Sequence, residues 1–182
     1  MKKIIIIVTI IISGNLFSQK MITRIGEIKF EASMPALEEV AAKNNTASCI
    51  FDQTTGEFVS LALVKSFKFK VPLMEEHFNE NYIESTTYPK ATFKGKVIGF
   101  DAKKLVSNKA TAFVIEGDLT LHGVTKPVKT KIYFTPNGTK INAKSNFTIK
   151  NEDYKIKIPS LVKNKIADEV KIDLNFDLEE KK

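Results

Sequence analysis

The sequence predicts a mainly β domain of about eight antiparallel strands closed into a barrel, with one or two short helices. Three observations lead to this prediction. Apolar and polar residues alternate with a period of two through much of the chain after residue 20, as is typical of strands with one dry and one wet face. About eight segments show this pattern or a related apolar run, enough strands to close a sheet around one small ligand. Residues 116–128, EGDLTLHGVTKPV, indicate two strands joined by a turn at His122 and Gly123.

The strand segments differ in how regularly they alternate. On the two most regular ones, Phe147 and Phe176 share the apolar face, so we expect both to point into the barrel and Asn146 and Asn175 to face solvent. The segment 57–69 is apolar on both faces and is expected to be covered on both. We expect strands over residues 23–32, 46–52, 57–69, 91–101, 110–121, 127–135, 139–150 and 168–178.

Two short helices are expected between the strands. Residues 35–42 begin with proline, carry their acids early and are followed by a lysine, an order that suits the helix dipole. Residues 72–79 also begin with proline and carry apolar side chains at helical spacing. We expect this second helix to cover one side or one mouth of the barrel through Leu73, Met74 and Phe78.

The first residues indicate secretion. Two lysines follow Met1, residues 4–12 are an almost unbroken aliphatic run, and small polar residues come next. The run is too short for a membrane-spanning helix, which needs about 20 residues. We therefore expect a signal peptide over residues 1–18, cleavage after Ser18, and a periplasmic mature domain over residues 19–182.

Charge and cysteine content argue against several classes of protein. The 182-residue chain has a formal charge of +7, and the expected cleavage removes two lysines and no acid, which leaves +5. The lysines are spread along the strands and form no basic helical face, so nucleic-acid binding is not expected. Cys49 is the only cysteine and alternates with Ala47 and Phe51, so we expect a small buried side chain, with no disulfide and no reactive thiol.

The sequence lacks the residue patterns of an enzyme. Its two histidines, His77 and His122, lie in different segments without a second His or Cys at metal-ligand spacing. Half of a metal site at His77 is a less favoured interpretation than a residue on the helix surface or at its cap. A ring that bonds the backbone explains His122 at its turn equally well. Glu75 and Glu76 are adjacent and do not match the paired carboxylates of a glycosidase. No nucleophile elbow or glycine-rich phosphate loop is present, so we expect neither catalysis nor a cofactor.

Two segments resemble the YceI-like family. They are KSFKFKVPLMEEHFNENYIESTTYPKATFKGKV at residues 65–97 and GDLTLHGVTKPV at residues 117–128, the second being the hairpin most characteristic of the family. Residues 31–45 depart from the family pattern, because its aromatic and His-Ser motif near the first strands is missing. The resemblance extends unevenly over nearly all of the expected mature chain. It implies a secreted, lipocalin-like barrel of eight strands without catalytic activity, and some relatives bind a polyisoprenoid or similar apolar chain in the lumen.

The phenylalanines decide between a solid and a hollow barrel. Several alternate with small residues on one strand, as Phe93 does with Gly95, which is expected to leave room beside the ring. The residues alone favour a solid core, whereas the resemblance favours a ligand site. We therefore expect binding, storage or periplasmic transport of a long apolar ligand, such as an isoprenoid, a quinone or a fatty-acyl lipid. The alternative is a ligand-free barrel that acts as a stress-related or protein-interaction module of the cell envelope.

The expected ligand-binding residues are apolar side chains of the predicted strands and of the helix at 72–79. They are Phe67, Phe69, Leu73, Met74, Phe78, Phe93, Val97, Phe113, Ile115, Leu119, Ile132, Phe134, Phe147, Ile172, Leu174 and Phe176. The expected partner is a lipid-like small molecule. Transient contact with the membrane or other envelope components, and pairing into a homodimer, are left open by the sequence.

Overall fold

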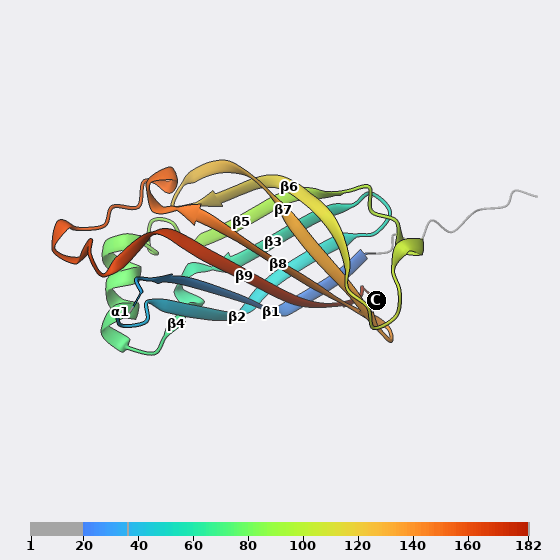
Figure 1. Ribbon diagram of the computed structural model, residues 1–182, viewed down its shortest axis with the longest axis horizontal. Helices are drawn as coiled ribbons and strands as arrows, with labels where there is room; N and C mark the ends of the chain where they lie inside the picture. The colour runs from blue at the N-terminus through green and yellow to red at the C-terminus, as the bar shows by residue number, and fades with distance from the viewer. Residues whose placement is uncertain (1–19, 36, 182) are drawn as a thin grey trace, which may run out of the picture.

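The strands close into an antiparallel barrel (Figure 1). The structure is a computed structural model that describes residues 20–35 and 37–181, so the expected signal peptide over 1–18 lies outside the described residues. The ring order is β1-β9-β8-β7-β6-β5-β3-β2, and β2 pairs back onto β1. The ring strands are β1 (Lys20–Ser33), β2 (Ala41–Asp52), β3 (Glu57–Leu63), β5 (Lys90–Ile98), β6 (Thr111–Leu121), β7 (Val124–Asn137), β8 (Lys140–Lys150) and β9 (Ile166–Glu180). The predicted fold class is confirmed.

Short elements lie between these strands. A two-residue strand, β4 (Lys68–Phe69), pairs with the start of β2. The predicted helix at 72–79 is confirmed as α1 (Pro72–His77), which continues into the π-helical turn η2 (Phe78–Tyr82). The 3₁₀ turns are η1 (Val64–Ser66), η3 (Ala102–Lys104), η4 (Asn151–Tyr154) and η5 (Ser160–Val162). No helix in the described part of the chain is long and apolar enough to cross a membrane.

The predicted helix over residues 35–42 is wrong. After a short turn the chain enters β2 at Ala41, which pairs with Glu31 of β1. The Ser33 hydroxyl accepts the backbone N–H of Val40 at 3.0 Å, which stabilises the end of this hairpin. A helix of eight residues is marginal in isolation, whereas the ladder with β1 satisfies the same backbone groups and extends the barrel wall.

The segment 57–69 is covered on one face only. It forms β3 as far as Leu63, and η1 then turns the chain towards β4. The outward side chains of Val59 and Leu63 are 40% and 47% exposed. The expected cover on both faces is therefore wrong, because the barrel has a single wall and β3 meets solvent on its outer side.

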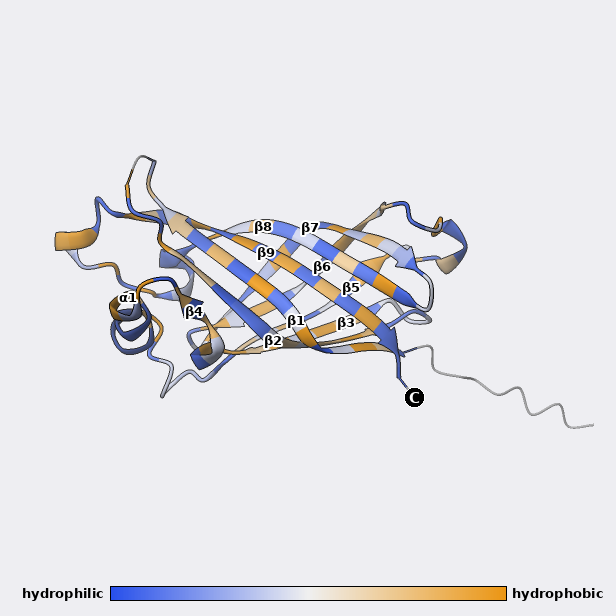
Figure 2. Ribbon diagram, turned by 90° about the horizontal axis from the view of Figure 1, so that it is seen from below, coloured by the Kyte–Doolittle hydropathy of each residue, from blue (hydrophilic) through white to orange (hydrophobic). Residues whose placement is uncertain are grey.

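The predicted facing of the regular strands is confirmed. Hydrophobic and hydrophilic residues alternate along β1 and β9 (Figure 2). Phe176 is completely buried and Phe147 packs against a buried cluster, whereas Asn146 is exposed. Asn175 is half-buried, and its Oδ1 accepts a hydrogen bond from Asn142. The prediction for Cys49 is also confirmed, since its side chain is 1% exposed and burial raises the pKa of its thiol.

Candidate functional site

The interior of the barrel has a solid half and a hollow half. The solid half lies towards the end of β9, away from α1 (Figure 1). Within it, the rings of Phe51 and Phe134 stack with centroids 4.8 Å apart, and those of Phe58 and Phe176 stack at 6.2 Å. Its side chains are Met21, Cys49, Phe51, Phe58, Val97, Phe100, Phe113, Ile115, Ile132, Phe134, Ile141, Ala143, Phe176 and Leu178.

The hollow half lies at the α1 end and encloses a cavity of about 570 Å³. Its wall consists of the inward side chains of β1, β3, β5, β6, β8 and β9, and most of them are apolar. The loop between β1 and β2, the α1 segment and the loop between β8 and β9 surround the mouth. This volume lies within the range of about 300–1,000 Å³ that is usual for small-molecule sites.

The boundary between the two halves can be followed along single strands. On β9, Leu174 lines the cavity and the next inward residue, Phe176, belongs to the solid half. On β3, Ser60 lines the cavity and Phe58 belongs to the solid half. The stacked rings of Phe58 and Phe176 therefore form the floor of the cavity.

Two glycines leave room for neighbouring phenylalanine rings, because they have no side chain. A Cβ atom at Gly26 would lie 2.2 Å from the ring of Phe176, and one at Gly95 would lie 2.7 Å from the ring of Phe93. The rings thus occupy the places that side chains at these glycines would need. The expected room beside Phe93 is consequently absent, because the Phe93 ring itself covers Gly95.

Aromatic rings from three elements meet near the mouth. Phe78 follows α1 and stacks on Phe30 of β1 at 5.3 Å, and Phe69 of β4 lies 5.2 Å from Phe78. Met74 and Phe78 both line the cavity, as expected for a helix that covers the mouth. Leu73 does not line it and is 56% exposed.

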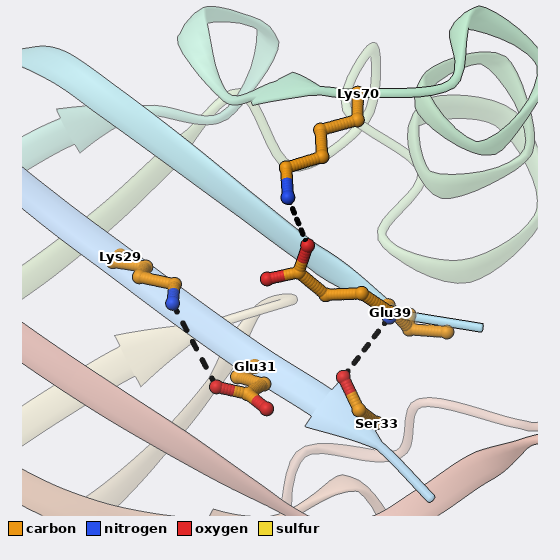
Figure 3. Close-up of polar contacts among 6 residues, drawn as sticks. Lys29, Glu31, Ser33, Glu39 and Lys70 are labelled. Atoms are coloured by element: carbon orange, nitrogen blue, oxygen red, sulfur yellow. Dashed lines mark hydrogen bonds and ion pairs between the residues drawn. The ribbon is translucent and has the colours of Figure 1, made fainter. Parts of the chain in front are cut away.

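Polar contacts position the β1–β2 loop beside the mouth (Figure 3). Lys70, just before α1, forms an ion pair and hydrogen bond with Glu39 of the loop. The hydrogen bond lowers the pKa of Glu39 and raises that of Lys70. Lys29 and Glu31 pair at 3.7 Å on the neighbouring face of β1. All these contacts are open to solvent, so they orient the loop but add little stability.

Two charged side chains and one histidine reach the cavity, all from the mouth segments of the described chain. Glu38 comes from the β1–β2 loop, His77 from α1 and Lys165 from the loop before β9. The β-strand wall contributes apolar or neutral side chains, such as Ala62 and Ile172. Such a site can enclose a hydrocarbon chain and leave a polar end near water.

His122 has a structural role in the hairpin formed by β6 and β7. Its Nδ1–H donates to the backbone carbonyl oxygen of Tyr154 at 2.9 Å, which favours the interpretation that the ring bonds the backbone. The Tyr88 ring lies 4.5 Å from the imidazole, and a Cβ atom at Gly123 would lie 2.6 Å from that tyrosine. Gly123 also has φ +70°, in the left-handed region that glycine adopts without strain. The His-Gly pair therefore joins the hairpin to η4 and to the segment before β5.

Metal binding finds no support in the geometry of the described residues. Within 20–35 and 37–181, no group of three or more His, Cys, Asp or Glu side chains is placed to hold a metal ion. His77 is exposed on α1.

The structure divides the predicted ligand-binding residues between the two halves. Those that line the cavity are Phe67, Phe69, Met74, Phe78, Phe93, Leu119, Phe147, Ile172 and Leu174. Those in the solid half are Val97, Phe113, Ile115, Ile132, Phe134 and Phe176, and Leu73 faces solvent. Sequence reasoning missed many other lining residues, among them Phe30, Ala62, Ile149, Ile156 and Val162. Phe30 and Ile149 lie on the apolar faces of predicted strands and could have been found. Ala62 lies in the segment 57–69, whose two apolar faces did not show which one points inward, and Ile156 and Val162 lie outside the predicted strands.

Comparison with protein families gives one match that covers most of the chain. The family model described as the YceI-like domain matches residues 23–178. No curated protein in the comparison matches this chain.

Solved structures share the fold at low sequence identity. A polyisoprenoid-binding domain from Saccharophagus degradans, implicated in plant cell wall breakdown, has a TM-score of 0.78 at 19% identity, over 90% of this chain and 99% of that one. BcnA from Burkholderia cenocepacia has a TM-score of 0.66 at 18% identity, over 84% and 94% of the two chains. The YCEI protein of Campylobacter jejuni has a TM-score of 0.63 at 17% identity, over 82% and 90%.

Proposed function

Because the chain belongs to the YceI-like family, we propose that it binds a long apolar molecule in the hollow half of its barrel and stores or carries that molecule in the periplasm. The observation that supports this proposal is the cavity of about 570 Å³ with its apolar wall. The polyisoprenoid-binding domain from Saccharophagus degradans, which has the same fold, supports a hydrocarbon ligand. Isoprenoid, quinone and fatty-acyl tails all have this chemistry.

Burial of hydrocarbon supplies the binding free energy. Each buried methylene contributes about 0.8 kcal/mol before the cost of ordering the ligand. A hydrocarbon chain in the cavity would contact an aliphatic surface on two strands. This surface is formed by Val170 and Ile172 of β9 and by Leu119 and Leu121 of β6. No charged anchor is needed for useful affinity, and Glu38 reaches the cavity from the β1–β2 loop at its mouth.

Secretion, which we expect from the first residues, agrees with a role in carrying a molecule that is poorly soluble in water. The basic start and aliphatic run of residues 1–12 are typical of a signal peptide. We expect the mature protein to begin at or near Gln19 and to occur in the periplasmic fraction. N-terminal sequencing of the protein from fractionated cells checks this, and an intact Met1 in membrane fractions would contradict it.

Mass spectrometry of an organic extract from the purified mature protein tests ligand binding. We expect a reproducible apolar compound at a stoichiometric level in the unmodified protein. Ala62→Phe places a ring inside the cavity and should reduce the amount retained, whereas Val59→Phe on the outer face of the same strand should not. A clean extract, together with failure of the folded protein to take up added fatty acids, would refute lipid binding and favour the ligand-free envelope module.

A further inference from the structure

We propose that the loop between β8 and β9 is a membrane-contact surface that docks on a bilayer of anionic phospholipid and brings the mouth of the cavity to it. The partner is the lipid surface itself, and the proposal does not depend on which molecule the cavity holds. The loop projects beyond the ends of the strands at the α1 end of the barrel (Figure 1). It is therefore placed to meet a surface before the barrel wall does.

The tip of this loop exposes a leucine. Leu161, in the turn η5, is 88% exposed, more than any other large hydrophobic side chain among the described residues. Its neighbour Val162 lines the cavity, and the Val162 N–H donates to the carbonyl oxygen of Pro159 at 3.0 Å, which holds the turn. An apolar side chain held in water in this way gains free energy when it enters the interfacial region of a bilayer.

The same loop is basic. Residues 154–167 contain no acidic residue and four exposed lysines, which are Lys155, Lys157, Lys163 and Lys165. The acids nearest in the sequence, Asp153 and Asp168, belong to η4 and β9 at the base of the loop. Among the described residues, no acidic side chain forms an ion pair with any of these four lysines. Each lysine near an anionic surface raises the binding constant about fivefold.

The other two mouth segments add apolar side chains without this excess of positive charge. Leu37 of the β1–β2 loop and Leu73 of α1 are 51% and 56% exposed. Acidic residues accompany both leucines, and two of these acids, Glu39 and Glu75, are paired with neighbouring lysines. The β8–β9 loop is therefore the side of the mouth that an anionic bilayer attracts.

A bilayer fits this loop better than an acidic protein does. A stable protein interface buries about 800 Å² on each partner, and one projecting turn with one exposed leucine offers only a small part of that area. The headgroup region of a bilayer accepts a single apolar side chain among lysines, because the ammonium groups stay hydrated beside the phosphates.

Vesicle flotation tests the proposal with the mature protein. We expect binding at low salt to vesicles of phosphatidylglycerol and phosphatidylcholine in equal parts, and about tenfold weaker binding of Leu161→Ser. Lys157→Gln combined with Lys163→Gln should weaken binding about 25-fold. The matched control, Lys103→Gln combined with Lys104→Gln, makes the same change of charge in η3 at the opposite end of the barrel and should leave binding unchanged (Figure 1).

Two results of the flotation experiment would overturn the proposal. Equal losses in the two double variants would show that the total charge of the protein, and not the loop, attracts it to the vesicles. Absence of binding to the anionic vesicles would exclude a lipid partner, and binding to soluble polyglutamate in their place would indicate an acidic protein. All the substituted side chains are exposed, and circular dichroism checks that each variant folds.

A tryptophan reporter locates the contact directly. The chain contains no tryptophan, so Leu161→Trp introduces a single fluorophore at the tip of the loop. Its emission should shift to shorter wavelength when anionic vesicles are added, because the indole enters the interfacial region. Val106→Trp, at a 55% exposed position of the β5–β6 loop, should show no shift. A shift at Val106 as large as that at Leu161, or no shift at Leu161, would contradict the contact surface.

Discussion

An inward side chain of this barrel either lines the cavity or fills the solid half. The alternation of apolar and polar residues along a strand does not distinguish these two roles. Leu174 and Phe176 are successive inward residues of β9, yet the first lines the cavity and the second closes it. The sequence predicted that Phe147 and Phe176 point inward, because alternation determines the face. It could not predict which of them meets empty space, because this depends on Gly26 in another strand.

Charge substitutions should separate the roles of these side chains. Phe176→Asp places a carboxylate in close-packed surroundings and should lower the free energy of unfolding by about 3 kcal/mol or more. Phe147→Asp should cost less, since water can enter the cavity beside it. Asn146→Asp on the outer face of β8 should cost less than about 1 kcal/mol. Urea unfolding followed by circular dichroism measures all three, and equal losses at Phe176 and Asn146 would contradict the assigned faces.

Tyr154 should titrate later than an ordinary tyrosine. Burial raises its pKa to about 12, and the charge of Asp153 acts in the same direction. An unfolded tyrosine has a pKa of about 10, so the folded state binds the proton more tightly. The resulting stability is complete below about pH 10 and is lost as the pH rises towards 12. Ultraviolet absorbance titration should show a late phenolate transition that Tyr154→Phe removes, and its persistence in that variant would refute the assignment.

At the scale of elements, pairing overrides local preference. The strands and α1 followed from alternation and from Pro72, and the match over residues 23–178 confirms the family resemblance of the two segments quoted from the sequence. The turn and strand entry at 35–42 could not be predicted from helix signals, because pairing of Ala41 with Glu31 decides its structure. The break of the predicted strand 57–69 at η1 has no comparable signal in the sequence.

The α1 segment should contribute to the binding site and not to the strength of the barrel. Phe78→Ser removes a ring that lines the cavity and stacks on Phe30, so affinity for an apolar ligand should fall about tenfold. The circular-dichroism signal of the sheet should be kept. Leu73→Ser changes an exposed side chain of the same helix and should leave the affinity unchanged. An equal loss of affinity in Leu73→Ser would support the sequence-based prediction that Leu73 binds ligand. Complete unfolding of Phe78→Ser would show that the α1 segment belongs to the hydrophobic core.

The barrel is closely packed at one end and holds the cavity at the other. The solid half buries stacked rings around Phe51 and Phe134 and stabilises the barrel. The remaining interior can then stay open at the α1 end, where the mouth segments lie (Figure 1). From the residues alone, a solid core was favoured, and this holds for one half. The division itself depends on contacts between strands that lie far apart in the sequence.

Nuclear Overhauser contacts between a bound chain and isoleucine methyl groups test this division most directly. The mature protein is labelled at isoleucine methyls and loaded with unlabelled hexadecanoic acid. We expect contacts from the acyl chain to Ile149 and Ile172, which line the cavity, and none to Ile115 and Ile132, which lie in the solid half. Comparable contacts to Ile115 and Ile132, or contacts to none of the four, would contradict a barrel that is closed at one end and binds its ligand at the other.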